Sequence, residues 1–120
     1  MTVRGIRGAT TAPVNEAPAI LLATRTLLEE IVSANALRAE DIAAVFFTTT
    51  DDLNAAFPAK AARDLGWQHV PLMDAQEIPV PGSVPRCIRV LLFWNSDTPQ
   101  DKVVHVYQGN ARVLRPDLSK

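Results

Sequence analysis

The chain has 120 residues, of which 48% are hydrophobic and 21% are charged, and its formal net charge is −1. A chain of this length forms one domain that buries roughly two-thirds of its unfolded surface, so we expect a single domain over residues 1–120. The near-zero net charge differs from the basic charge of nucleic-acid-binding proteins, so we do not expect nucleic acid as a partner. No apolar run reaches the ~18 residues of a membrane helix, so we do not expect a membrane as a partner.

The first half of the sequence predicts a strand, a long helix and a second strand. Residues 2–11, TVRGIRGATT, alternate in the manner of a short strand. A helix begins near Asn15 or Glu16 and ends around Asn35, because apolar residues then recur every three or four positions. The run IAAVFFTTT, residues 42–50, is rich in β-branched and aromatic side chains, which favours a central strand.

The second half predicts a short helix followed by several strands. Pro58 and Gly66 are typical of the first turn and the end of a short helix, and proline limits a strand over WQHVPLM to a sheet edge or a bulge. A stiff connection with several prolines precedes the last strands. The elements expected here are a helix over residues 58–65, strands over 67–73, 87–94 and 102–108, and a tail over 110–120 that lies across a neighbouring subunit.

This order of elements predicts an α+β fold in which a long helix and a short helix cover one face of a sheet. Two helices are too few to cover both faces. The second face would hold Arg7 and Arg89 among apolar neighbours, and self-association would cover it.

The sequence offers few nucleophiles or metal ligands. Cys87 is the one cysteine, and its apolar neighbours predict a buried packing residue; a single cysteine excludes an internal disulfide and fits a reducing cytoplasm. His69 and His105 lack a second ligand at metal spacing, so both are interpreted as structural or surface residues. Neither a phosphate-binding glycine loop, nor a nucleophile elbow, nor a signal-peptide pattern is present. We therefore expect no metal and a cytoplasmic location.

Arginine on strands is the most informative pattern. Arg7 and Arg89 occupy positions where a sheet face is expected to be apolar, and a charge there is costly unless it meets a partner. Glu77 is the nearest acidic candidate. Guanidinium groups on a partly dry surface suit a small polycarboxylate, with chemistry that relies on positioning and fixed charge. Ordinary alternatives remain for the solvated charges Arg63 and Arg115, for Glu77 as a loop residue and for Tyr107 as a packing residue.

Several sequence blocks occur together in one order along the chain. They are VRGIRGATT from Val3, FPAKAAR from Phe57, QE at Gln76–Glu77, CIRV around Arg89, SDTPQD, HVY from His105, and VLRPDL near the end. In this order they resemble the AroH class of monofunctional chorismate mutases over essentially the whole chain. The resemblance implies a homotrimer with a pseudo-α/β-barrel arrangement of mixed sheets and outer helices, and active sites between neighbouring subunits. It also implies the Claisen rearrangement of chorismate to prephenate, on the route to phenylalanine and tyrosine, without cofactor or metal.

The resemblance implies a role for each matching residue. Arg89 would donate to the ether oxygen and to a carboxylate of the substrate. Arg7 would bind the side-chain carboxylate with help from Tyr107, and Glu77 would accept a hydrogen bond from the ring hydroxyl. The other implied contacts are Phe57 and Ala59 in the pocket wall, Lys60, Arg63 and Arg115 near the mouth, and Leu114 in the tail.

The sequence departs from the family pattern just before Glu77. Met73 and Asp74 stand where the best-known members have threonine and cysteine. Met73 can contact the substrate ring through its backbone or its thioether. Asp74 places a second carboxylate near Glu77, which would raise the pKa of one of the two unless a cation compensates. Both are kept as candidate substrate contacts, and the LGWQH segment is one residue shorter than in some relatives.

Two other functions fit a trimer that binds carboxylates. One is an imine deaminase resembling the YjgF/RidA family, which also uses an arginine between subunits. The RGIRG, CIRV and VLRPDL blocks argue against it. The other is a non-catalytic trimer that binds an acid of the aromatic pathway, and the presence of Arg7, Glu77 and Arg89 argues against loss of activity.

Overall fold

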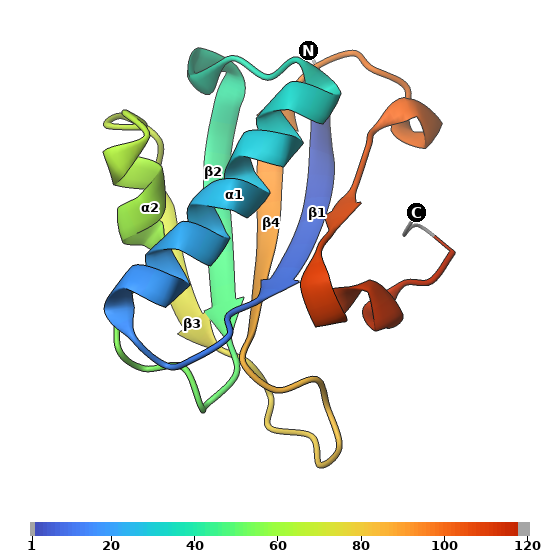
Figure 1. Cartoon of the computed structure of the whole chain (residues 1–120). Coiled ribbons are helices and arrows are strands. Elements are labelled where there is room, and N and C mark those ends of the chain that lie inside the picture. The colour runs from blue at the N-terminus through green and yellow to red at the C-terminus, as the bar shows by residue number, and fades with distance from the viewer. Residues whose placement is uncertain (1, 118–120) are drawn as a thin grey trace.

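The chain forms an α+β fold around a five-stranded mixed sheet; the computed structural model describes residues 2–117 (Figure 1). The strand order is β3-β2-β4-β1-β5, in which β4 pairs antiparallel with β1 and β2, whereas the outer strands pair parallel with their neighbours. The elements are β1 (Val3–Thr11), α1 (Ala17–Asn35), η1 (Ala39–Asp41), β2 (Ile42–Thr49), α2 (Ala59–Asp64), β3 (Leu72–Gln76), β4 (Cys87–Asn95), η2 (Gln100–Lys102), β5 (Val106–Tyr107) and η3 (Gly109–Leu114), where η denotes a 3₁₀ helix. The predicted α+β class is confirmed.

Helix α1 lies across the sheet because its apolar residues fall on one side (Figure 1). The buried side chains of α1 are Ile20, Thr24, Leu27, Leu28 and Ile31. Gly8 of β1 permits the close approach of this helix. A Cβ atom at Gly8 would come within 2.7 Å of Ile31 Cδ1 and 2.9 Å of Val90 Cγ1, distances that real side chains do not tolerate.

The sheet has a covered face and an open face. On the covered face Val45, Phe47 and Leu92 join the apolar side of α1 and the alanines of α2 in the main core. Side chains alternate between faces along a strand, so the neighbours of these residues point the other way. Phe46, Leu91 and Met73 are exposed there, Met73 at 58%. The open face therefore presents a band of apolar side chains to its surroundings.

Two predicted strands differ from the observed ones. Residues 67–73 are predicted to be a strand, but the buried Trp67 lies in irregular backbone between two turns and β3 begins only at Leu72. Strand β5 covers two residues of the predicted 102–108 because Asn35 of α1 takes the place of a strand partner. Its side chain donates to the carbonyl of Val104 at 2.9 Å and accepts from the Val104 N–H at 2.9 Å.

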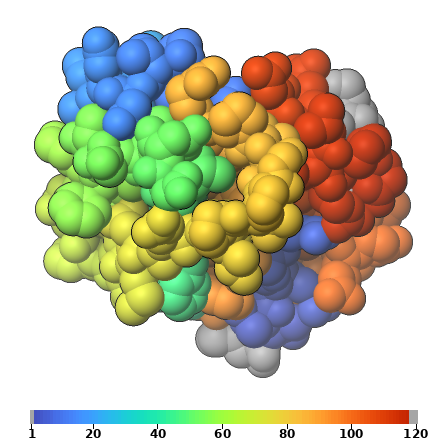
Figure 2. All heavy atoms as spheres, turned by 90° about the horizontal axis from the view of Figure 1, so that it is seen from below, coloured from blue at the N-terminus to red at the C-terminus, as the bar shows by residue number. Residues whose placement is uncertain are grey.

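The loop after β2 and the connection from β3 to β4 lie at the same end of the molecule (Figure 1). Seen from below, the proline-rich connection from β3 to β4 lies in the middle, between the loop after β2 in green and the C-terminal residues in red (Figure 2). The last three residues of the predicted tail lie outside the described residues. No helix within residues 2–117 is long and apolar enough to cross a bilayer.

Candidate active site

Four of the predicted site residues line one cavity on the open face. Arg7, Glu77, Arg89 and Tyr107 come from β1, the segment after β3, β4 and β5, and they surround a volume of about 330 Å³. Phe46, Leu91 and Thr48 contribute to the rest of the wall. We call this volume the open-face cavity. Its composition, two guanidinium groups and one carboxylate beside apolar carbon, suits a small anionic ring.

Arg89 stands in the middle of the open face. Its register partners are Ala9 of β1 and Thr48 of β2. The strand around it is apolar because its alternate residues enter the core, whereas Arg89 points away from that core and its side chain is 48% exposed. The expected dry surroundings of this guanidinium are therefore not supplied by one chain alone.

Glu77 is held beside Arg89 from two directions. Its backbone N–H donates to the Thr49 carbonyl at 2.8 Å, which extends the β2–β3 ladder by one residue. Thr48 Oγ1 donates to Glu77 Oε2 at 2.7 Å, and Arg89 Nη1 lies 3.5 Å from the same oxygen. The ion pair is longer than a direct hydrogen bond, so the guanidinium fork keeps donors for a ligand. Thr48 was not among the predicted site residues.

Tyr107 lines one side of the open-face cavity, and residues of the C-terminal segment pack against Tyr107. Tyr107 is buried with Ala9, Cys87 and Ala111, and Leu114 packs against this group. Arg115 follows Leu114, and its guanidinium donates to Asp117 at 2.8 and 3.1 Å. Arg115, and to a smaller degree Arg7, lower the pKa of Asp117. The tail residues thus lie near Arg7 and Tyr107 without lining the cavity.

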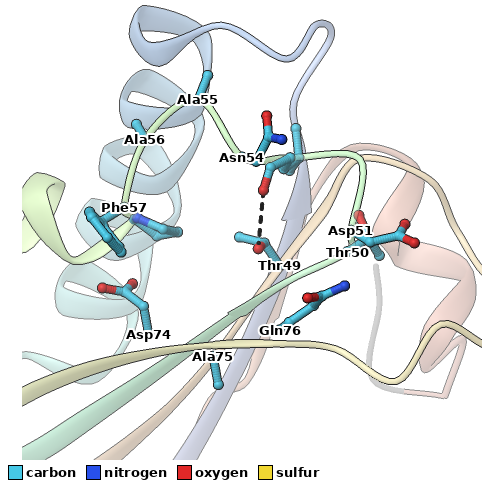
Figure 3. Close-up of a pocket in the computed structure, with 12 residues that line it drawn as sticks. Thr49, Thr50, Asp51, Asn54, Ala55, Ala56, Phe57, Asp74, Ala75 and Gln76 are labelled. Carbon is cyan, nitrogen blue, oxygen red and sulfur yellow. Dashed lines mark hydrogen bonds between the residues drawn. The ribbon is translucent and has the colours of Figure 1, made fainter.

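The predicted site residues of α2 and its surroundings lie away from the open-face cavity. Phe57 and Asp74 line a second cavity of about 430 Å³, which lies between the loop after β2 and the ends of β2 and β3 (Figure 3). We call it the strand-end cavity. Phe57 is 70% exposed. Because α2 packs on the covered face, the sheet separates its residues from the open-face cavity.

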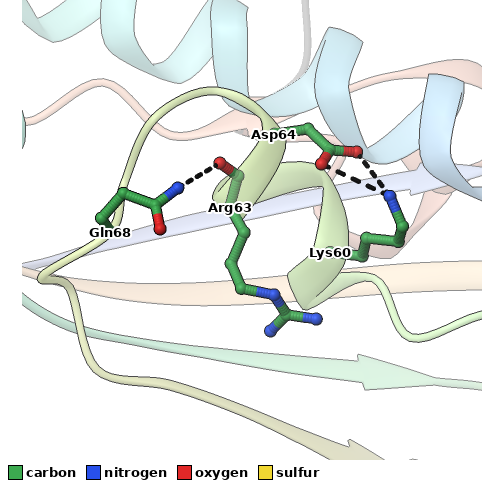
Figure 4. Close-up of polar contacts among 4 residues, drawn as sticks. All are labelled: Lys60, Arg63, Asp64 and Gln68. Carbon is green, nitrogen blue, oxygen red and sulfur yellow. Dashed lines mark hydrogen bonds and ion pairs between the residues drawn. The ribbon is translucent and has the colours of Figure 1, made fainter.

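Helix α2 presents its charged residues to the outside. Lys60 pairs with Asp64 at 3.0 Å on the surface, and Arg63 extends in another direction (Figure 4). The carbonyl of Arg63 accepts a hydrogen bond from Gln68 at 3.0 Å, which ties the end of the helix to the next turn. Ala59 is buried against the core.

Asp74 and Glu77 do not face each other. Asp74 points toward Phe57 (Figure 3), and its carboxylate accepts the Ala59 N–H at 3.1 Å, whereas Glu77 enters the open-face cavity. Burial raises the pKa of Asp74, against the smaller opposing effects of the Ala59 N–H and Arg63. The predicted pKa conflict between the two carboxylates is therefore replaced by a desolvation effect on Asp74 alone. Met73 lies on the open face instead.

Cys87 is not a competent nucleophile. Burial raises the pKa of Cys87 to about 11, although nearby Arg89 opposes this shift. A thiol with such a pKa stays protonated at neutral pH and does not attack. Within residues 2–117, no three of the His, Cys, Asp and Glu side chains come together as a metal site. The open-face cavity presents the charged side chains of Arg7, Glu77 and Arg89.

Comparisons with known proteins identify the family of the chain. The family model described as chorismate mutase type I matches residues 3–118. The chain is 57% identical over 117 residues to chorismate mutase AroH of Thermus thermophilus, covering 97% of this chain and 96% of that protein. It is 48% identical over 120 residues to chorismate mutase AroH of Bacillus subtilis (strain 168), covering 99% and 94%. A solved chorismate mutase from Clostridium thermocellum superposes with a TM-score of 0.90 at 47% identity, covering 91% of this chain and 97% of that one. The chain therefore belongs to the type I chorismate mutase family.

Proposed function

We propose that the chain converts chorismate to prephenate in the open-face cavity, by restraint of the substrate and by fixed charge. One observation carries the proposal: Arg7, Glu77, Arg89 and Tyr107 converge on this cavity from four separate segments. The rearrangement is unimolecular. One carbon–oxygen bond breaks while one carbon–carbon bond forms, so neither an electron carrier nor a covalent intermediate takes part.

The charge requirement of the reaction explains the arginine on β4. As the ether bond breaks, negative charge grows on the ether oxygen and positive charge spreads over the ring. A cation beside that oxygen stabilises the transition state more than the substrate, which raises the rate constant. Arg89 supplies this cation. One preorganised donor of this kind typically contributes about 3–4 kcal/mol.

The remaining groups hold chorismate in its compact, reactive shape. Arg7 binds the side-chain carboxylate, with Tyr107 beside it. Thr48 and Arg89 both contact Oε2 of Glu77, which leaves Oε1 to accept a hydrogen bond from the ring hydroxyl. Holding the reacting carbons together removes much of the entropic part of the barrier.

A second copy of the chain completes the site. The open face exposes Met73, Phe46 and Leu91, and a homotrimer in a pseudo-α/β-barrel arrangement covers such a face. The predicted contacts that this chain holds away from its own open-face cavity then come from the neighbour. They are Phe57, Ala59, Lys60, Arg63 and Asp74. The cover also dries the surroundings of Arg89, which strengthens its effect on the ether oxygen.

Chorismate turnover tests the reaction. The loss of chorismate absorbance is followed in the ultraviolet, and prephenate is identified by its acid conversion to phenylpyruvate. We expect acceleration over buffer without a burst, since no covalent intermediate accumulates. Turnover equal to that in buffer would contradict the proposed function.

Mixing two inactive variants tests the shared site. One is Arg89→Gln, in the open-face cavity, and the other is the double variant Phe57→Asp, Arg63→Glu, which repels a dianion from the other half. Random exchange of subunits would leave about a quarter of the sites with two intact halves. We expect about that fraction of the parent activity to return after joint refolding. No recovery above the separate variants would place the whole site within one chain.

A further inference from the structure

His105 takes the place of a strand partner beside Arg7. Strand β5 pairs with β1 only at Gly8 and Ala9, and the Gln108 N–H donates to the Ala9 carbonyl at 2.9 Å. Arg7 lies two residues before Ala9, so its backbone groups point to the same edge. There the Arg7 N–H donates to Nδ1 of His105 at 2.9 Å. A side chain thus continues the β1–β5 hydrogen bonding where the backbone pairing ends.

The backbone is fixed on both sides of His105. Val104 is fixed to α1 through the two hydrogen bonds with Asn35, each 2.9 Å long. Val106 is fixed by its pairing with Gly8. His105 is half-buried between them. The Nδ1 position is therefore set by backbone anchored to two different elements.

This geometry requires a neutral imidazole. A backbone N–H can only donate, so Nδ1 must present its lone pair and the ring proton must lie on Nε2. The charged groups that act on the ring are Arg7 of β1 and Arg115 of the tail, the latter paired with Asp117; α1 contributes the neutral Asn35. Burial and the two arginines lower the pKa of His105, which favours the neutral form at pH 7.

We propose that His105 is a positioning residue for Arg7, whose neutral imidazole fixes the β1 backbone and so directs the guanidinium into the open-face cavity. The inference rests on the proposed binding of a substrate carboxylate by Arg7. When Nδ1 is protonated it becomes a donor that faces the Arg7 N–H, so the hydrogen bond is lost. Arg7 then binds the carboxylate less well, although total positive charge near the cavity has increased.

Two replacements of His105 separate its acceptor from its titration. In His105→Asn the side-chain oxygen can occupy the place of Nδ1 and accept the same N–H, but it has no proton to gain near neutral pH. His105→Leu has similar size and no acceptor. The matched control is His69→Asn, since His69 is exposed in the turn before β3 and bonds to neither Arg7 nor the open-face cavity.

The kinetic readout is kcat/KM for chorismate between about pH 5 and 8, where substrate carboxylates stay ionised. We expect the parent and His69→Asn to lose kcat/KM in acid, with a midpoint below the ordinary histidine value of about 6.5. His105→Leu should lower kcat/KM about 3- to 10-fold at every pH, mostly through KM, as the loss of one hydrogen bond predicts. His105→Asn should restore most of that loss and remove the acid limb. An acid limb that persists in His105→Asn, or a kcat/KM that rises in acid, would overturn the proposal.

An amide readout distinguishes the contact from the function. The NMR shift of the Arg7 amide should titrate with the imidazole in the parent and stay constant in His105→Asn. If the Arg7 amide is indifferent to the His105 titration, the hydrogen bond itself is wrong and the inference fails. If the amide titrates but Arg7→Ala leaves KM for chorismate unchanged, the contact stands and the proposed role of Arg7 fails, and the positioning claim fails with it. Absence of turnover in the parent would instead refute the proposed reaction.

Discussion

Replacing Arg89 with glutamine removes the cation nearest to the expected ether oxygen while retaining an amide donor. Glu77 should stay in place, because Thr48 still donates to its Oε2 at 2.7 Å. A unit charge about 3 Å from half an elementary charge, at an effective dielectric of about 20, contributes about 3 kcal/mol. An effective dielectric of about 20 describes charge interactions in proteins even at buried sites, so it also applies when a second copy covers Arg89. The expected loss in kcat is therefore about 100-fold.

The assay measures kcat and KM for chorismate with purified, folded variants. Arg89→Gln should lower kcat more than it raises KM, because the charge on the ether oxygen develops only in the transition state. Arg89→Lys should lose about 10-fold, since it keeps a cation without the fork of the guanidinium. Arg25→Gln is the control: Arg25 pairs with Glu29 at 3.5 Å on the outer side of α1, and its loss should not alter kcat. A fall of less than about 5-fold in kcat for a folded Arg89→Gln would refute the electrostatic reasoning.

Three further changes test the surroundings of the site. Gly8→Ala should lower the free energy of unfolding by about 1–3 kcal/mol in denaturant melts, because its Cβ meets Ile31 Cδ1 at 2.7 Å; an unchanged midpoint would show that α1 moves aside freely. Asp74→Asn can keep an acceptor for the Ala59 N–H. Since burial raises the pKa of Asp74, the parent loses stability as pH rises from the unfolded pKa through the folded one. The asparagine variant should thus melt higher than the parent at pH 7 and equal to it at pH 3, and a lower melting temperature at pH 7 would contradict the desolvation argument. Cys87→Ala should keep kcat within about 2-fold, because a thiol with a pKa of about 11 is not a nucleophile; a folded but inactive variant would reopen covalent catalysis.

The sequence predicts those parts of the site that depend on local periodicity. Arg7 and Arg89 lie on one face because side chains alternate along β1 and β4 and the strands run antiparallel in register. The same alternation, read along β3, would have separated Asp74 from Glu77. The apolar residues on either side of Arg89 lie on the face of β4 that enters the core, whereas Arg89 itself lies on the open face.

The missed features depend on contacts between distant residues. The hydrogen bond from Thr48 to Glu77 joins positions far apart in sequence. A threonine on β2 does not indicate a glutamate partner after β3, nor does the glutamate indicate the threonine. His105 was interpreted as a structural or surface residue because nothing near it in sequence indicates the backbone of Arg7. In the same way, Asn35 ends a helix and also replaces a strand partner for Val104. Local pattern does not encode such pairings.

A structure with a stable bicyclic dicarboxylate ether, which imitates the compact shape in which chorismate reacts, tests the site most directly. We predict that this compound lies in the open-face cavity, with its ether oxygen within hydrogen-bond distance of the Arg89 guanidinium and one carboxylate on Arg7. Phe57 and Arg63 of a second copy should cover it. Binding in the strand-end cavity, or an ether oxygen without contact to Arg89, would contradict the proposed mechanism.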